Sequence, residues 1–258
     1  MGISMTTVSG SVRAALLAAA MTLAACDSAP TGAQPAPGAS TPNYDRAALI
    51  DYLVDNPDII EEAIGAFQGR MRGEVIADNR AAIETPFPGA VQGAEDADVT
   101  IVEFFDYACP YCKRSHGDVQ RLLKEDPKLR VVYRNMPVLG PNSRRAAEVA
   151  LAPAQEGKYS AFHNEFFEDE RRNSDEKIRD VATDVGMAPG IVDLARNREA
   201  VTSEIDKNLA LARQLNIGGT PAYVIGDEMV DGAVGYDALK SAVERARRSK
   251  ASASAATR

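Results

Sequence analysis

Two cysteines that lie three positions apart constrain this chain more than any other feature of its sequence. They belong to the segment Cys109-Pro110-Tyr111-Cys112, and the third cysteine, Cys26, lies far upstream. A disulfide between Cys109 and Cys112 would close so short a loop that loop-closure entropy adds little stability. We therefore expect this bond to be made and broken in a reaction rather than to hold the fold together.

The sequence around the pair predicts a strand, a tight turn and a helix. Residues 98–105 are mostly β-branched and aromatic, as in a buried strand, and residues 109–124 have helical composition. A thiol at the start of a helix faces unpaired backbone N–H groups, and Lys113 and Arg114 add positive charge one turn later.

This environment predicts different roles for the two thiols. We expect Cys109 to ionise well below the pKa of about 8.5 that free cysteine has, and to attack the substrate. Cys112 lies one turn inside the helix, where it is shielded and slower to react. We expect it to resolve the mixed disulfide that Cys109 forms.

Glu103 lies in the middle of the apolar strand, where an ionised carboxylate is costly unless it is paired or protonated. The alternation of strand side chains places it on one face with Ile101 and Phe105. The functional interpretation is a buried proton acceptor for Cys112, because the resolving thiol must lose its proton before it attacks. The alternative is a residue at a sheet edge or in a salt bridge.

Three short motifs follow one another along the chain. They are Val102-Glu103-Phe104-Phe105, Cys109-Pro110-Tyr111-Cys112 and Gly219-Thr220-Pro221-Ala222. In this order they resemble the DsbA-like branch of the thioredoxin superfamily. The resemblance implies an α/β thioredoxin fold over residues 89–248 and a buried acid, Glu103, six residues before the first cysteine. It also implies that Pro221 is a cis-proline beside the cysteines, in a loop that offers backbone groups to an extended substrate peptide together with Thr220.

The remaining segments fit such a domain. We expect strands at residues 129–135, 222–226 and 229–231, a closing helix at 236–248 and a disordered tail at 249–258. Helical composition between the strands predicts a helical insertion at about 140–216, and DsbA-like proteins carry a helical domain there that covers one side of the active site. The predicted helices of the insertion cover residues 142–155, 158–170, 175–185, 190–197 and 201–216.

Residues 44–88 predict a helical extension in front of this domain. Asn56 and Pro57 can begin a helix that continues to about Glu84. An apolar stripe recurs at three- and four-residue steps. Its residues are Ile60, Ala63, Ile64, Phe67, Met71 and Val75. The stripe packs against the chain's own thioredoxin domain or mediates self-association, as the extensions of ScsC-like proteins do.

The first 25 residues predict a secretion signal, with a single charge at Arg13 and a short apolar segment behind it. Leu23-Ala24-Ala25-Cys26 resembles the bacterial lipobox, in which the cysteine becomes the lipid-modified first residue. The alternative is ordinary cleavage that leaves Cys26 as a free thiol. Residues 27–43 contain four prolines and no large apolar side chain, which predicts a disordered tether. In enteric bacteria an aspartate in the position of Asp27 is associated with retention at the inner membrane.

Composition excludes several classes of function. The net charge is −8, which argues against a nucleic-acid partner, and no apolar run reaches the roughly 18 residues of a membrane span. A zinc site is disfavoured because Cys109, Cys112 and His116 give only three candidate ligands. His163-Asn164-Glu165 follows the cysteines, whereas the zinc deaminases need this motif before them. We expect neither a metal nor a bound cofactor.

The sequence thus predicts a periplasmic thiol:disulfide oxidoreductase, lipid-anchored at the inner membrane, that exchanges disulfides with exported proteins through Cys109. The expected partners are these substrates and a membrane redox partner. The direction of exchange stays open, because an isomerase or reductase made oligomeric by the N-terminal helix has the same motifs. The alternative from another class is a non-catalytic chaperone or scaffold tethered to the membrane.

Overall fold

The computed structural model describes residues 45–152 and 157–256. The predicted signal peptide, the lipidation site Cys26 and the predicted tether lie outside these residues. The chain divides into two units, residues 1–52 and 53–258. The described part of the first unit is the beginning of helix α1 (Arg46–Asp55), in which no residue is buried. The sheet and the cysteine pair belong to the second unit.

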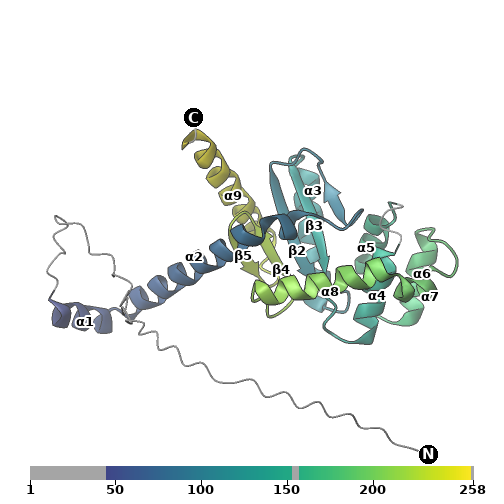
Figure 1. Cartoon of the computed structure of the whole chain (residues 1–258), viewed down its shortest axis with the longest axis horizontal. Coiled ribbons are helices and arrows are strands. Elements are labelled where there is room, and N and C mark those ends of the chain that lie inside the picture. Colours follow the sequence, from purple (N-terminus) through teal and green to yellow (C-terminus); the bar gives the residue numbers. More distant parts are fainter. Residues whose placement is uncertain (1–44, 153–156, 257–258) are drawn as a thin grey trace, which may run out of the picture. The chain divides into compact units, whose positions relative to one another are not determined.

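Among the described residues, five strands form one sheet in the order β1-β3-β2-β4-β5 (Figure 1). The strands are β1 (Val91–Gly93), β2 (Val99–Phe105), β3 (Leu129–Asn135), β4 (Ala222–Ile225) and β5 (Glu228–Asp231). The central pair, β2 and β3, is parallel, and the other pairs are antiparallel. The predicted α/β thioredoxin fold is confirmed in this arrangement, whereas β1 has only three residues and was not predicted.

Helices cover both faces of the sheet because the side chains of β2 alternate between two apolar clusters. Ile101 and Phe105 pack with residues of α3 (Pro110–Glu125) and α9 (Tyr236–Ala256). Val102 and Phe104 pack on the opposite face with residues of α2 (Pro57–Glu84) and α8 (Glu199–Gln214). Glu103 therefore lies on the face of α3, the helix that carries Cys112.

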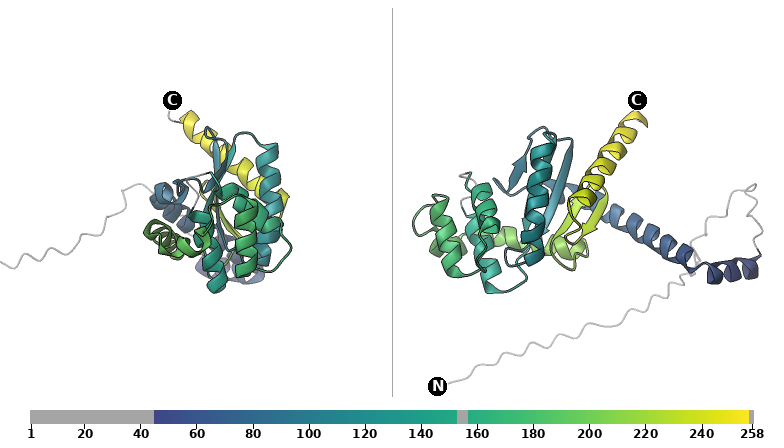
Figure 2. Two further views of the ribbon diagram at one scale, coloured as in Figure 1. Left: turned by 90° about the vertical axis from the view of Figure 1, so that its right-hand side faces the viewer. Right: turned by 180° about the vertical axis from the view of Figure 1, so that it is seen from behind.

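The described part of the segment between β3 and β4 consists mainly of helices. Figure 2 shows most of them grouped beside the sheet, while the last one, α8, runs across a face of the sheet. They are α4 (Pro141–Leu151), α5 (Tyr159–Glu168), α6 (Asp175–Asp184), α7 (Ile191–Leu194), the short 3-10 helix η2 (Ala195–Asn197) and α8. The aromatic side chains of α5 belong to the same apolar cluster as α3. The insertion thus forms one wall of the region around the cysteines.

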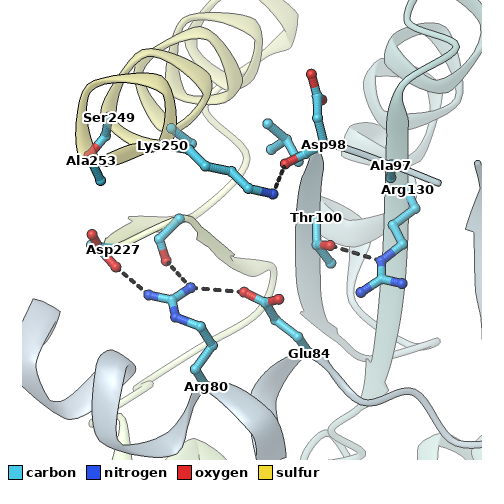
Figure 3. A pocket seen from close by; sticks show the side chains of 13 residues that line it. Arg80, Glu84, Ala97, Asp98, Thr100, Arg130, Asp227, Ser249, Lys250 and Ala253 are labelled. Atoms are coloured by element: carbon cyan, nitrogen blue, oxygen red, sulfur yellow. Dashed lines mark hydrogen bonds and ion pairs between the residues drawn. The ribbon is translucent and has the colours of Figure 1, made fainter. Parts of the chain in front are cut away.

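The predicted disordered tail at residues 249–258 is wrong, because α9 continues as a helix to Ala256. Charged contacts hold this extension on the start of β2. Arg247, just before this segment, forms ion pairs with Asp98 and Asp126. Lys250 Nζ donates to the carbonyl oxygen of Asp98 at 2.8 Å (Figure 3). These partners lie more than 100 residues away in sequence, so the composition of the tail alone could not reveal them.

A buried arginine on β3 fastens the end of α2 to the domain. Arg134 is only 4% exposed and donates hydrogen bonds to the carbonyl oxygens of Ala82, Ile83 and Thr85. Its other terminal nitrogen donates to Glu204 of α8 at 2.8 Å. The last carbonyl groups of a helix lack partners within the helix, so Arg134 satisfies them from outside.

The apolar stripe of α2 is divided between two environments. Ile76 and Ile83, near the end of the helix, are buried against the sheet. Four residues of the predicted stripe are 40–57% exposed in the single chain: Ile60, Ile64, Phe67 and Met71. Val75, the last residue of the predicted stripe, packs partly buried against the same cluster. Packing on the chain's own domain therefore accounts for the C-terminal end of the stripe but not for its four exposed residues. No helix of the described ranges combines the length and the apolar character that a membrane span requires.

Candidate active site

Asp106 fixes the turn between β2 and α3 that carries the first cysteine. This buried carboxylate accepts hydrogen bonds from the backbone N–H groups of Ala108 at 2.7 Å, Val138 at 2.8 Å and Leu139 at 2.9 Å. Its carbonyl oxygen accepts from the N–H of Cys109. A single side chain thus joins the cysteine turn to the loop that follows β3.

Cys109 directly precedes the first residue of α3 and is 5% exposed. Its Sγ lies 3.2 Å from the carbonyl oxygen of Thr220. A hydrogen bond with the Cys112 thiol lowers the pKa of Cys109 to about 5, although burial opposes this shift. The Thr220 side chain and the backbone N–H groups of Tyr111 and Cys112 lower the pKa of Cys109 further. Cys109 is therefore suited to be a thiolate at neutral pH.

The source of this stabilisation differs in part from the prediction. The backbone groups at the start of the helix contribute as expected, but Lys113 and Arg114, the two cations nearest the cysteines, have other partners. Lys113 Nζ donates to the carbonyl oxygen of Asp169 at 2.7 Å. The guanidinium of Arg114 lies over the ring of Tyr111, 4.9 Å from its centroid. Hydrogen bonds, rather than these side-chain charges, account for the acidity of Cys109.

Cys112 lies in the first turn of α3 and is completely buried. Burial is the largest cause that raises the pKa of the Cys112 thiol, and the neighbouring Cys109 and the charge of Glu103 raise it as well. The two cysteines are both free thiols. The pair therefore contains one acidic thiol and one that gives up its proton only with help, which suits the roles of attacking and resolving cysteine.

Glu103 is 3% exposed, and burial raises its pKa to about 8. The hydroxyl of Tyr223 on β4 donates to Glu103 Oε1 at 3.4 Å and lowers this pKa somewhat. Ser115 Oγ on α3 lies 2.6 Å from the same tyrosine hydroxyl. Glu103 thus lies on an inner strand and forms no salt bridge with any residue that the structure describes. A carboxyl group with a pKa of about 8 can exchange protons at neutral pH.

The Thr220–Pro221 peptide bond is cis. This loop brings Thr220 against Cys109 although the two residues are 111 positions apart. Tyr111, between the cysteines, is 55% exposed, and Pro110 is the first residue of α3. The structure therefore brings Cys109, Cys112 and Thr220 together as predicted, with Glu103 beneath them on the sheet.

Sequence reasoning missed several residues of this region. Nothing in the sequence marked Tyr223 and Ser115 apart from their positions near the predicted motifs, and Asp106, three residues before Cys109, was not predicted to take part.

The two histidines near the site, His116 and His163, are both buried, with ring centroids 5.2 Å apart, and burial lowers the pKa of His116 to about 4. His116 is thus a core residue rather than a surface histidine. Within the described ranges, no group of three or more metal-binding side chains is placed to hold an ion.

A family model described as the DSBA-like thioredoxin domain matches residues 100–244. The chain belongs to this family. The match spans both cysteines, Glu103 and the cis-proline, so the residues that form the site in space are also those that place the chain among DsbA-like proteins.

Several solved structures resemble two thirds or more of this chain. A thioredoxin-like oxidoreductase from Silicibacter pomeroyi DSS-3 is 39% identical, with a TM-score of 0.63 over 66% of this chain and 98% of that one. A linker-deletion mutant of ScsC from Proteus mirabilis is 30% identical, with a TM-score of 0.64 over 80% of this chain and 93% of that one. The thiol-disulfide exchange protein alpha-DsbA2 from Wolbachia pipientis is 28% identical, with a TM-score of 0.64 over 69% and 97%.

Curated relatives fall into two groups. Disulfide bond formation protein D of Bacillus subtilis (strain 168) is 27% identical over 172 residues, which are 62% of this chain and 78% of that protein. Na(+)/H(+) antiporter NhaA 3 of Salinispora tropica is 30% identical over 157 residues, which are 59% of this chain but 24% of the antiporter. The chain thus spans about a quarter of the antiporter's length. The DsbA-like family and the names of the disulfide-exchange relatives support thiol:disulfide oxidoreductase activity.

Proposed function

We propose that this protein exchanges disulfides with exported proteins through a mixed disulfide at Cys109. The observation that carries the proposal is the environment of this sulfur. An acidic thiol at the start of α3 touches Thr220 beside a cis-proline and lies next to a second, buried thiol. An extended peptide can add to the exposed backbone of such a loop as a strand would.

The proposed exchange takes place in two thiolate attacks. A substrate thiolate attacks Cys109 Sγ of the oxidised pair, the bond between Cys109 and Cys112 breaks, and Cys112 takes up the electron pair and a proton. A second substrate thiolate attacks the substrate sulfur of the mixed disulfide and releases Cys109 as a thiolate. Two electrons pass from the substrate to the cysteine pair, and the reverse sequence reduces a substrate disulfide.

Glu103 has the role of proton donor and acceptor for Cys112 in this scheme. The thiol of Cys112 is too weak an acid to ionise by itself near neutral pH, and its pKa responds to the charge of Glu103. A buried carboxyl group with a pKa of about 8 is protonated often enough to donate and deprotonated often enough to accept.

The cellular placement is also a proposal. Residues 1–25 would direct export, Cys26 would carry the lipid, and the tether would hold the domain at the periplasmic side of the inner membrane. A membrane redox partner would then restore the oxidised pair. Support comes from the sequence patterns and from a similar solved structure that is described as a periplasmic thioredoxin-like protein from Salmonella enterica serovar Typhimurium. Residues 1–44 themselves lie outside the described part of the chain.

Disulfide isomerase or reductase activity in an oligomer is the second candidate. The exposed stripe of α2 favours it, because Ile60, Ile64, Phe67 and Met71 follow one another at steps of four, three and four residues. This is the spacing of a heptad seam, which pairs helices of like sequence. The occupant of the seam would be the α2 helix of a second copy, which would hold two active sites together.

The non-catalytic alternative is a tethered chaperone or scaffold that uses the same peptide loop without turnover. Two experiments separate these functions. Cys109→Ser should abolish insulin reduction and disulfide transfer, whereas a pure chaperone would keep its activity. The second experiment measures the reduction potential of the Cys109/Cys112 pair at equilibrium with glutathione, together with the mass of the protein. A potential above about −150 mV in a monomer favours an oxidase, and a lower potential in an oligomer favours an isomerase.

A further inference from the structure

A pocket of about 770 Å³ opens beside Cys109. Its walls come from the start of α3, from α5 and α6 of the insertion, and from the loop that follows β3. The apolar part of the wall includes Phe166, Phe167 and Leu139, and Leu139 is 54% exposed. The pocket therefore reaches the reactive sulfur on the side of the helical insertion.

The charged lining of this pocket is mostly cationic. Lys113, Arg171, Arg172 and Lys177 line it, whereas Glu170 is the one acidic residue of the lining. The whole chain carries a net charge of −8, so this excess of positive charge is local. Arg171 is neutralised by ion pairs with Asp169 and Asp180, which leaves the two lysines and Arg172 as the relevant cations.

Lys177 is the most unusual of these groups. It is 3% exposed. Its Nζ donates to the carbonyl oxygens of Asp169 and Arg171, both at 2.9 Å, and the same nitrogen lies over the ring of Phe166. Within the described ranges it has hydrogen bonds but no carboxylate at ion-pair distance. The two carbonyl groups and the ring stabilise this ammonium group without neutralising its charge, so an anion that arrives nearby would be stabilised.

Lys113 adds a second positive charge at the same point. Its Nζ donates to the Asp169 carbonyl oxygen at 2.7 Å, so the two ammonium groups share one acceptor atom. Burial is the main cause that lowers the pKa of Lys177, and the charges of Lys113 and Arg171 lower it further, while Asp169 raises it. Glu170 lies 3.4 Å from Lys113 Nζ, but its side chain is 93% exposed and solvent screens the pair.

We propose that this Lys113/Lys177 pocket binds a carboxylate that the substrate carries within a few residues of its reactive sulfur. The proposal rests on the disulfide exchange proposed above and adds a preference among its substrates. The ammonium groups would bind the carboxylate, and the apolar wall would cover the neighbouring part of the peptide. The carboxylate belongs either to an acidic side chain of a protein substrate or to a small acidic thiol such as glutathione.

The test compares disulfide peptides that differ at one position near the cysteine. Three peptides carry Glu, Gln or Lys there, and each forms a mixed disulfide with the same chromophore. We expect the oxidoreductase to react about tenfold faster with the Glu peptide than with the Lys peptide, an effect of one charge-assisted hydrogen bond. The preference should weaken as ionic strength rises, because salt screens the attraction. Equal rates for the Glu and Lys peptides at low salt would overturn the proposal.

Two variants locate the preference in the pocket. Lys113→Gln should reduce the ratio of the Glu rate to the Lys rate, and Lys113→Glu should invert it. The ratio is taken within one variant, so any change in the reactivity of Cys109 cancels. Lys124→Gln is the matched control, because Lys124 is an exposed residue of the same helix and does not line the pocket. An equal loss of preference in Lys113→Gln and Lys124→Gln would contradict a role of the pocket.

Reduction rates of small disulfides show whether the carboxylate comes from a small thiol or from a protein segment. Faster reduction of glutathione disulfide than of neutral hydroxyethyl disulfide, lost in Lys113→Gln, supports a small acidic thiol. A preference confined to the peptides supports a protein segment. Failure of every peptide to react with the wild-type protein would overturn the proposed function itself, and with it this inference.

Discussion

Tyr223 donates a hydrogen bond to Glu103 across the boundary between β4 and β2, with 3.4 Å between the hydroxyl and Oε1. The two residues are register partners in the antiparallel pair, and Ser115 of α3 contacts the same hydroxyl. The other strand neighbour of Glu103 is Tyr133 on β3, whose hydroxyl donates to Gln92 instead. Tyr223 therefore tunes a buried carboxyl group whose charge acts on Cys112.

Tyr223→Phe should raise the pKa of Glu103 further above its value of about 8, because it removes a hydrogen bond that stabilises the carboxylate. The step in which Cys112 resolves a mixed disulfide should then need a pH higher by about half a unit to one unit. The measurement is the pH profile of this step in stopped-flow experiments.

Tyr133→Phe is the matched control for this prediction. It removes a hydroxyl from the opposite neighbour of Glu103 without removing a hydrogen bond to the carboxyl group. The other groups near Glu103, which are Cys112, Tyr107 and Tyr159, stay unchanged. The same shift in both variants would show that Tyr223 has no special part.

Cys109 should titrate with a midpoint of about 5 in the reduced protein. The measurement is the thiolate absorbance near 240 nm, with Cys109→Ser as the blank. Cys112→Ala should move the midpoint upward, since the hydrogen bond with Cys112 is the largest cause of the acidity. A wild-type midpoint near 8.5, as in free cysteine, would contradict the structure of this site and the function built on it.

Glu103→Gln should change how stability depends on pH. The pKa of Glu103 is raised from 4.5 to about 8 in the folded protein, so the folded state binds more protons than the unfolded state between these values. Stability must therefore fall as pH rises through this window. The glutamine variant lacks this decline, so its free energy of unfolding should exceed that of the wild type by on the order of a few kcal/mol at pH 8, but not at pH 4.

Denaturant unfolding at both pH values checks this prediction on the reduced protein. The difference between the two pH values is the relevant quantity, because any packing change made by the substitution is the same at each. An identical pH dependence in the variant and the wild type would mean that Glu103 titrates normally.

Arg134→Met should destabilise the domain by about 3–5 kcal/mol, because Glu204 would remain as a buried charge without its partner. The end of α2 would lose its hydrogen bonds as well. Arg130→Met on the same strand is the control, since within residues 45–152 and 157–256 the Arg130 side chain has one hydrogen bond, to Thr100, and no ion pair. We expect a loss of about 1 kcal/mol or less there. Urea unfolding measures the free energy of unfolding of both variants. Equal losses of stability in Arg134→Met and Arg130→Met would contradict the role of Arg134.

Phe67→Glu should convert an oligomer into a monomer if the exposed stripe of α2 pairs with a second copy. The charge would lie in the middle of the apolar seam, where an unpaired carboxylate is costly. Sedimentation velocity on the chain without residues 1–43 gives the mass. Gln68→Glu adds the same charge at an exposed position outside the stripe and should leave the mass unchanged. A monomeric wild-type chain would remove the oligomer from consideration.

The sequence alone predicted the strand, turn and helix around the cysteines from local patterns, which are the apolar run of residues 99–105 and the spacing of Cys109 and Cys112. The cis-proline loop was predicted from the resemblance to DsbA-like proteins, and the helical insertion from helical composition together with that resemblance. Glu103 was noticed for the same reason, because a charge inside an apolar strand demands an explanation wherever the strand lies.

The tertiary structure decided which distant residues meet. Tyr223 reaches Glu103, Lys177 shares the Asp169 carbonyl oxygen with Lys113, and Arg134 binds the end of α2, although tens of positions or more separate most of these partners. A local pattern can predict that a residue belongs to a strand or a helix, but the direction of a charged side chain depends on the acceptors that other elements bring near it. For this reason the expectation that Lys113 stabilises Cys109 was wrong: its side chain lies in the neighbouring pocket, where Asp169 supplies the acceptor.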